Sequence, residues 1–448
     1  MVSAYQTQLI QIKLTEFESG LLKFLTQRSN SLYNQAVYYV LRRHEMVNPG
    51  GIVSANYEDM ASELKDESNY KLLYSQVAQQ TLKAVVESFN GYKELFKLWA
   101  SGRLEIKPHI PKYRKKGGLY PITYPAIALS FDLSSTVVRI PLGNGIKAEL
   151  GLNELYIPCP YGIRPEQIVE LSIVPRNGCF YAAYIYKTSV EKVELDYKLA
   201  LGIDHGVGNW LTCLSNQGLS FIIDGLHFKS LNNWFNKHVA YLKEGKAQGF
   251  WSQKLASITE KRNRQARDTV NKAARKIVNF CIENKIGNVV FGWNKQQKDS
   301  SNMSKQNNQK FVQIPTAKVK NRIAQLCGQY GIVFTETEES YTSKSSFLDN
   351  DFLPTFGEEN KPKGWKSSGK RIQRGLFRTA KNYLVNADLN GCANILRKVA
   401  RTLNIDLAEL GKGTLTTPVR LRIWDISRRV DRTIVTQSNL LRTESSPL

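Results

Sequence analysis

The spacing of apolar residues changes along the chain and indicates several structural blocks. Residues 4 to 14 read as a strand, and Thr15-Glu16-Phe17-Glu18 then has the spacing of a helix capping box. Beyond this box, apolar residues recur every three or four positions in runs that reach Trp99. The first hundred residues are therefore predicted to form one strand followed by a helical block over residues 16–100.

Short strand-like runs replace the helical pattern from residue 105 to residue 190. They include Ile127 to Phe131, Val137 to Ile140, and Cys179 to Tyr186, which follows an Asn177-Gly178 pair typical of a hairpin turn. These runs predict a small β-barrel. Because the first strand precedes the helical block, we expect residues 1–15 and 101–196 to share this barrel, with residues 16–100 inserted into it.

A third pattern begins at Ala200. The strand that ends at Asp204 is followed by two more strands, a long basic helix, and strands at 288–291 and 332–335 on either side of a helix at 315–330. This order, completed by a last helix, is an α/β arrangement like that of ribonuclease H. The predicted fold class is a multidomain α+β protein with an α/β domain over residues 197–400. Residues 401–448 are expected to be a tail that is partly disordered.

The charge of the chain favours a polyanionic partner. Among 448 residues, 62 Lys and Arg outnumber 39 Asp and Glu, which gives a net charge of +23. No run of about 18 apolar residues predicts a membrane span, and the start lacks the features of a signal peptide. We therefore expect a cytoplasmic, nucleoid-associated protein with no membrane contact. The six cysteines form no CxxC pair, so neither a disulfide framework nor a cysteine-rich zinc site is indicated.

Clusters of basic residues are the candidate nucleic-acid contacts. A proline-containing run near residue 110, the polar face of the long helix, and a glycine-rich loop over 361–371 each combine cations in a way that suits phosphate contact. A solvated surface is the plain alternative for each of them. The predicted nucleic-acid-binding residues are Lys107, Lys112, Tyr113, Arg114, Lys115, Lys116, Arg262, Arg264, Arg267, Lys370 and Arg371.

Two aspartates are candidate metal ligands. Asp204 ends an apolar strand, and Asp388 is expected near the start of the last helix, so the two can meet at one edge of a sheet. Hydrolysis of a phosphodiester with magnesium uses carboxylates that converge on two metal ions about 3.5 to 4 Å apart. Taken singly, an Asp at a strand end or a helix start is most often a cap or turn residue. The pair, set among Gly and Asn, is what indicates a site.

These motifs resemble a known family. Gly202-Ile203-Asp204-His205-Gly206-Val207-Gly208-Asn209 resembles the first motif, and the segment from Asn386 to Asn394 the third motif, of the RuvC-like nuclease domain of TnpB proteins. TnpB proteins are transposon-encoded RNA-guided nucleases related to type V CRISPR effectors. Residues 75–80, the Pro-Lys-Tyr-Arg-Lys run and Tyr341-Thr342-Ser343-Lys344 are similar to further landmarks of the family, so the resemblance extends to about residue 400.

The resemblance implies a function and partners. The barrel would be a wedge domain, the helical insertion a recognition lobe, and residues 197–400 a RuvC-like domain. A guide RNA from the transposon end would pair with duplex DNA beside a short target-adjacent motif. Cleavage would use two Mg²⁺ ions at one site, with one protein for each RNA.

Two positions depart from the family pattern. The glutamate that most members carry after the central strand is Gly292 here, and residues 345–349, in the loop 341–378, lack the cysteines of the family's zinc module. No zinc is therefore expected. In some relatives and in the eukaryotic Fanzor proteins, a glutamate before the Thr-Ser motif replaces the missing one. Glu338 and Glu339 both lie there, and Glu339 has the better spacing.

The predicted catalytic and metal-binding triad is Asp204, Glu339 and Asp388, and the predicted function is that of an RNA-guided DNA endonuclease. One alternative is a catalytically inactive RNA-guided DNA-binding protein, similar to TnpB-derived repressors. Another is a ribonuclease H-like transposase that needs no guide. Retention of both aspartates favours the active enzyme over the inactive binder, because metal chemistry is the evident reason to keep the two together.

Overall fold

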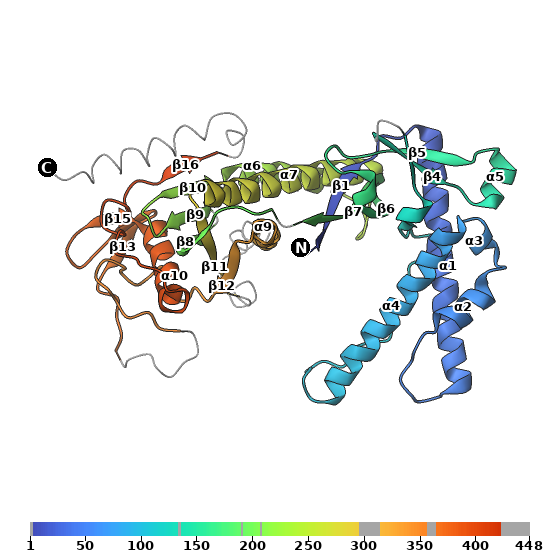
Figure 1. Ribbon diagram of the computed structural model, residues 1–448, viewed down its shortest axis with the longest axis horizontal. Coiled ribbons are helices and arrows are strands. Elements are labelled where there is room, and N and C mark those ends of the chain that lie inside the picture. Colours follow the sequence, from blue (N-terminus) through green and yellow to red (C-terminus); the bar gives the residue numbers. More distant parts are fainter. Residues whose placement is uncertain are drawn as a thin grey trace. The chain divides into compact units, whose positions relative to one another are not determined.

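The computed structural model describes residues 3–132, 136–189, 191–206, 208–294, 314–355 and 364–422 (Figure 1). The chain divides into two compact units, Met1–Ser189 and Val190–Leu448. Both units contain helices and sheets, and the predicted mixed α/β multidomain fold is confirmed. None of the helices in the described ranges is long and apolar enough to cross a membrane.

The helical block of the first unit follows the predicted pattern. Its first helix begins at the expected capping box, in which the Thr15 hydroxyl accepts from the Glu18 amide and the Glu18 carboxylate accepts from the Thr15 amide at 2.8 Å. The helices are α1 (Glu16–Val47), α2 (Tyr57–Leu64), α3 (Ser68–Lys71) and α4 (Ser75–Ala100). The strand β1 (Ser3–Gln11) precedes them, as predicted.

The strands of the first unit form two sheets. The first has the order β1-β7-β6-β2 and the second the order β3-β4-β5. The bounds are β2 (Ile122–Pro125), β3 (Ser130–Phe131), β4 (Val137–Pro141), β5 (Glu154–Pro158), β6 (Ile168–Arg176) and β7 (Cys179–Ser189), with 3-10 turns at Ala126–Ala128 and Pro165–Gln167 and helix α5 at Asn144–Leu150.

Part of the predicted strand arrangement is confirmed. β1 pairs antiparallel with β7 from Ser3↔Ser189 to Gln11↔Tyr181, so the first strand does join strands that follow the helical block. Asn177 and Gly178 turn β6 into β7 with φ of 46° and 75°, the left-handed conformation of a tight hairpin turn. The prediction that these strands close into one barrel is wrong within the described residues, because their pairing leaves two separate sheets.

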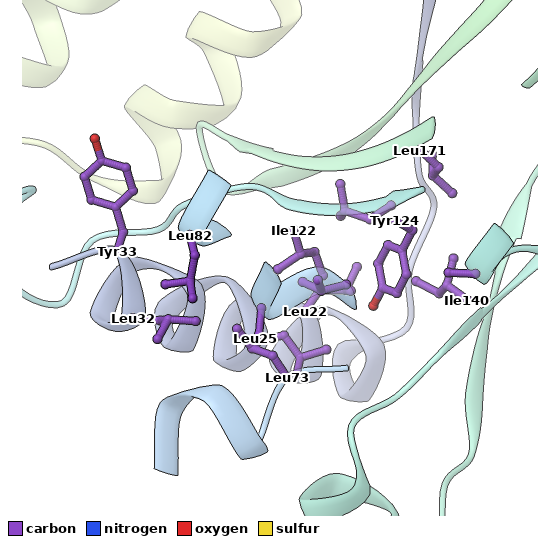
Figure 2. Packing of buried hydrophobic residues seen from close by; sticks show 14 of the residues in the cluster. Leu22, Leu25, Leu32, Tyr33, Leu73, Leu82, Ile122, Tyr124, Ile140 and Leu171 are labelled. Carbon is purple, nitrogen blue, oxygen red and sulfur yellow. The ribbon is translucent and has the colours of Figure 1, made fainter. Parts of the chain in front are cut away.

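Helices and strands of the first unit share one hydrophobic core (Figure 2). Leu22, Leu25 and Leu32 come from one face of α1, and Leu82 of α4 is fully buried beside them. Ile122 and Tyr124 of β2 join the same cluster. The predicted helical periodicity therefore marks the face of α1 that packs against α4 and the sheet.

The second unit is organised around a six-stranded sheet with the order β12-β11-β8-β9-β10-β16. β8, β9 and β10 are antiparallel, whereas β11 is parallel to β8, β12 to β11, and β16 to β10. The bounds are β8 (Asp196–His205), β9 (Asn209–Ser215), β10 (Ser220–Asp224), β11 (Ile286–Gly292), β12 (Val333–Thr337) and β16 (Val419–Leu421).

Helices cover both faces of this sheet. The cluster on one face joins Leu201 and Ile203 of β8 to residues of α7 and α9, and the cluster on the other joins Ala200 to residues of α10. At Gly202 a Cβ would lie 2.8 Å from Leu396 Cγ, so glycine lets α10 lie close against β8. The helices are α6 (Leu226–Lys243), α7 (Gln253–Glu283), α9 (Thr316–Tyr330) and α10 (Ala387–Leu403).

Two later segments pack onto the same unit. A small antiparallel sheet leads into α10, whose N-cap Asn386 accepts from the Asp388 and Leu389 amides. After α10, Leu410 and Leu415 are buried in the α10 cluster before β16 begins. The tip that we expect to be disordered lies outside the described residues. The small sheet consists of β13 (Lys370–Gln373), β14 (Leu376–Arg378) and β15 (Leu384–Asn386).

Candidate active site

A cavity of about 870 Å³ lies at one edge of the second unit's sheet. Asp204, Glu339 and Asp388 all line it. Asp204 lies at the end of β8, Glu339 follows β12, and Asp388 lies in the first turn of α10. Three segments that are far apart in sequence therefore bring the three predicted carboxylates to one cavity.

Asp204 is partly buried where the end of β8 lies against α10. At Gly391 a Cβ would lie 3.0 Å from Asp204 Oδ2, so the glycine of the Asn386–Asn394 motif makes room for this carboxylate. Burial raises the pKa of Asp204 well above its usual range, and the nearby Glu339 and Asp388 raise it further. The three acids therefore repel one another, and a bound cation would offset this repulsion.

Glu339 fills the space beside Gly292. A Cβ at position 292 would lie 3.1 Å from Glu339 Oε2 and 2.5 Å from Ile395 Cδ1. The Glu339 side chain is only 9% exposed, and His205 Nε2 lies 3.6 Å from its Oε1. A larger residue at position 292 would therefore compete with the Glu339 carboxylate for the same volume.

The segment that follows Glu339 is anchored by α10. Asn394 Nδ2 donates to the carbonyl oxygens of Thr342 and Ser345, at 2.9 and 2.8 Å. Asn390 Nδ2 also donates to the Ser345 carbonyl, at 2.8 Å. These two asparagines of the Asn386–Asn394 motif are fully buried, so they fix the Thr-Ser loop against the helix that carries Asp388.

Glu338 points to a different environment. It lines another cavity, where it forms an ion pair with Lys398 and accepts from the Ser340 amide at 2.5 Å. Burial raises the pKa of Glu338, but these partners outweigh it and lower the pKa overall. Of the two candidate glutamates, Glu339 is thus the one that shares a cavity with the aspartates.

Both oxygens of Asp388 have partners. Arg371 Nη2 donates to Oδ1 at 3.1 Å, and Asn209 Nδ2 donates to Oδ2 at 2.5 Å. Arg420 Nη1 in turn donates to Asn209 Oδ1 at 2.9 Å. The side chain of Asp388 is therefore oriented by residues from three other segments.

Cations surround the three acids. Five of them line the cavity together with the carboxylates, so they can bind the non-bridging oxygens of a nucleic-acid backbone. They are Lys229, Lys344, Arg371, Arg374 and Arg420. Of these, only Arg371 is among the predicted nucleic-acid-binding residues, and Lys344 belongs to the Thr-Ser motif.

The predicted contacts near residue 110 lie in the first unit. Lys107 Nζ lies 4.9 Å from the Trp99 ring, and Arg114 lies over Tyr33 and Tyr120 while its Nε donates to Asn30 Oδ1 at 3.3 Å. The side chains of Lys112, Tyr113, Lys115 and Lys116 are exposed. Lys107 and Arg114 are exposed as well, so the contacts of Arg114 orient it without closing it off from a ligand.

Arg262 and Arg267, two of the three predicted contacts on α7, are engaged by other side chains of the protein. The Arg262 Nε and Nη2 atoms donate to Asn232 Oδ1 of α6 at 3.1 and 2.9 Å, and partial burial lowers its pKa. Arg267 pairs at 3.0 Å with Glu260, whose side chain is 2% exposed. Arg264 is exposed, as is Lys370 on β13.

The segment in place of the family's zinc module is held by carboxylates. Asp349 Oδ2 accepts from the Ser346 hydroxyl at 2.6 Å and from the Ala380 amide at 2.7 Å. Asp351 Oδ2 accepts from the Ser346 amide at 2.7 Å and from the Ser368 amide at 3.1 Å. Two aspartates thus join the turn after the Thr-Ser motif to the segment before β13 and to the loop between β14 and β15.

The donor set fits magnesium, although it is not arranged around a single ion. Among the residues that the structure describes, no three His, Cys, Asp or Glu side chains meet closely enough to hold one ion. Mg²⁺ usually takes only one or two protein carboxylates and keeps water or phosphate oxygens as its other ligands. Asp204 and Glu339 suit this role as they stand, and Asp388 suits it once Oδ1 is released from Arg371.

Comparison with solved structures gives the class of fold. The chain is similar to Cas12f1 in a complex with sgRNA and target DNA, with a TM-score of 0.53 and 18% identity over 85% of this chain and 83% of that one. It is also similar to the mini-RNA-guided endonuclease Cas_phi3, with a TM-score of 0.41 and 10% identity over 93% and 94% of the two chains. The likeness to Cas12f1 shows that this chain has a fold similar to that of Cas12f1.

A family model matches one segment of the chain. Residues 183–309 match OrfB_IS605, described as a probable transposase. The predicted resemblance to TnpB-type transposases is thereby confirmed. None of the curated proteins matches the chain.

Proposed function

We propose that the chain is an RNA-guided DNA endonuclease of a transposon that cuts at a single RuvC-like site. The observation that carries this proposal is the convergence of Asp204, Glu339 and Asp388 on one cavity that cations also line. The substrate class follows from those cations and from the net charge of +23. A guide RNA and duplex DNA are the proposed partners, as named for the Cas12f1 complex.

The proposed domain roles follow the order of the chain. Residues 1–15 and 101–196 would form the wedge domain, residues 16–100 the recognition lobe, and residues 197–400 the nuclease domain, followed by a C-terminal segment from 401. Base pairing would read the target sequence, and the protein would read the shape of the heteroduplex and a short adjacent motif.

The proposed reaction is hydrolysis of a phosphodiester. A water oxygen attacks phosphorus and loses one proton to solvent, the bond from phosphorus to the leaving sugar oxygen breaks, and that oxygen takes up a proton. Arg374 and Lys344 would bind the non-bridging oxygens, while Asp204 and Glu339 would orient the attacking water. When bound at these carboxylates and Asp388, two Mg²⁺ ions would activate the water and stabilise the leaving oxygen.

A second candidate function is RNA-guided DNA binding without cleavage. The observation that favours it is the Asp388 carboxylate, whose oxygens are both engaged by Arg371 and Asn209. In that case Arg371 would replace the cation that an active site needs.

One experiment separates these functions. The full-length protein is purified from cells that carry its native locus, its bound RNA is sequenced, and the complex is mixed with a matched duplex from a randomised library. Magnesium-dependent cuts that Asp204→Ala abolishes support the endonuclease. Target binding without cuts supports the binder, and absence of bound RNA contradicts both.

A further inference from the structure

Arg420, which follows all the sequence motifs along the chain, is connected to Asp388 through Asn209. Arg420 Nη1 donates to Asn209 Oδ1 at 2.9 Å, and Asn209 Nδ2 donates to Asp388 Oδ2 at 2.5 Å. All three residues line the same cavity. Two hydrogen bonds therefore connect the last strand of the sheet to one of the proposed metal ligands.

The chemistry of the three groups fixes which atoms donate and which accept in these two hydrogen bonds. A guanidinium can only donate, and an ionised carboxylate can only accept. The amide oxygen of Asn209 must therefore face Arg420, and its NH₂ group must face Asp388. Without Arg420, the amide could rotate and present its oxygen to the carboxylate, which would repel it.

The fold delivers Arg420 to this point through a segment that follows α10. β16 pairs in parallel with β10 at Phe221↔Val419, Ile222↔Arg420 and Ile223↔Leu421. Leu415 is fully buried and Leu421 is 3% exposed, so core packing holds the segment on both sides of Arg420. The position of Arg420 is thus set by the sheet.

The hydrogen bonds from Arg420 through Asn209 engage only Oδ2 of Asp388 and leave Oδ1 available to ligate a cation. Asn209 engages Oδ2, whereas Oδ1 is engaged only through the partly exposed pair with Arg371. Holding Oδ2 fixes the rotation of the carboxylate, so Oδ1 keeps its direction when Arg371 moves to another anion. This is what an outer partner of a metal ligand does.

We propose that Arg420 is a positioning residue, which orients Asp388 through Asn209 so that Asp388 can ligate a divalent cation. This inference rests on the proposed metal-dependent function. It assigns a role in the site to a residue outside the matched range 183–309 and beyond the motif at 386–394.

The test is Mn²⁺ binding to the full-length protein, measured by electron paramagnetic resonance with Mn²⁺ as the probe. Loss of an outer partner typically weakens metal affinity about 10- to 100-fold, so Asn209→Ala should fall in that range. Arg420 is exposed and lies one hydrogen bond further from Asp388 than Asn209 does. Arg420→Ala should therefore weaken Mn²⁺ binding by a smaller factor, about 3- to 10-fold. Arg420→Lys keeps a donor and should recover part of this loss.

A double variant tests whether the two residues act in series. If Arg420 acts only through Asn209, Asn209→Ala/Arg420→Ala should bind Mn²⁺ no more weakly than Asn209→Ala. Arg422→Ala removes the same charge two residues further on and should bind like wild type. Additive losses, or equal losses from Arg420→Ala and Arg422→Ala, would show a general charge effect and overturn the proposal.

The outcome for the proposed function is read separately. If wild type and Asp204→Ala show the same Mn²⁺ binding, the metal-dependent function fails and the inference fails with it. If wild type binds more tightly than Asp204→Ala but Arg420→Ala binds like wild type, only the role of Arg420 is overturned. Melting temperatures confirm that each variant is folded. If Arg420→Ala does not fold, Arg420→Lys takes its place in the comparison.

Discussion

Exchanging the glutamate between positions 339 and 292 tests whether Glu339 has replaced the missing carboxylate. A Cβ at position 292 would lie 3.1 Å from Glu339 Oε2 and 2.5 Å from Ile395 Cδ1. The two side chains therefore compete for one space. We predict that Glu339→Ala strongly slows cleavage, that Gly292→Glu alone impairs it, and that Gly292→Glu/Glu339→Ala recovers part of the rate lost in Glu339→Ala.

The magnitudes follow from these contacts. Removal of one preorganised charge-stabilising group costs about 100- to 1,000-fold in rate, which is the loss expected for Glu339→Ala. Gly292→Glu overpacks a buried site, at a cost of about 1 to 3 kcal/mol in unfolding free energy, and places two acids together. The double variant keeps only the contact with Ile395, which Ile395→Val relieves at its own cost of about 0.5 to 1.5 kcal/mol.

The assay is magnesium-dependent cleavage of a matched duplex, with melting temperature and target binding measured on the same samples. Glu338→Ala is the matched control and should cut like wild type, because Glu338 pairs with Lys398 in another cavity. Full activity of Glu339→Ala would refute the assignment. So would a folded, target-binding double variant that cuts no better than Glu339→Ala.

Four further predictions concern single residues near the cavity. Arg371→Ala should tighten Mn²⁺ binding by up to about 5-fold in electron paramagnetic resonance, because a partly exposed pair with Asp388 contributes at most about 1 kcal/mol; weaker binding would exclude competition between Arg371 and the metal. In EDTA, Asp204→Asn should raise the melting temperature at neutral pH. Burial and the other acids raise the pKa of Asp204, so its ionisation destabilises the fold as pH rises through that pKa, and a lower melting temperature would contradict this. Asp349→Asn should lower the unfolding free energy in denaturant titrations by about 1 to 2 kcal/mol, through weaker bonds to Ser346 and Ala380, whereas an unchanged value would show that the carboxylate is dispensable. Gly391→Ala should stay folded by circular dichroism but bind Mn²⁺ more weakly, since its Cβ would lie 3.0 Å from Asp204 Oδ2; unchanged affinity would show that the carboxylate can shift without loss.

Local patterns predicted the secondary structure well. The capping box at Thr15 starts a helix, Asn177-Gly178 turns one strand into the next, and the helix expected at 315–330 runs from Thr316 to Tyr330. These features depend on backbone preferences and on one buried face, which short stretches of sequence encode. The start of the strand expected at Ile127 was wrong, because a 3-10 turn occupies Ala126–Ala128 and the strand begins at Ser130.

Long-range pairing was harder to predict. Strands that alternate well enough for a barrel form two sheets, because strand spacing does not say which edges meet. The same limit applies to the charges on α7. The sequence predicts Arg262 and Arg267 as nucleic-acid contacts, with a solvated face as the alternative, and in the fold Asn232 and Glu260 engage them.

The sequence by itself determined the ingredients of this site: the Asp204 and Asp388 motifs, the gap at Gly292, and the two glutamates before the Thr-Ser loop. Only the tertiary structure placed Glu339 rather than Glu338 beside the aspartates, and brought Arg420 to Asn209 through a strand added at the sheet edge. The physical reason is that motifs record which groups a chain carries, whereas the packing of α10 and β16 on the sheet sets where those groups meet.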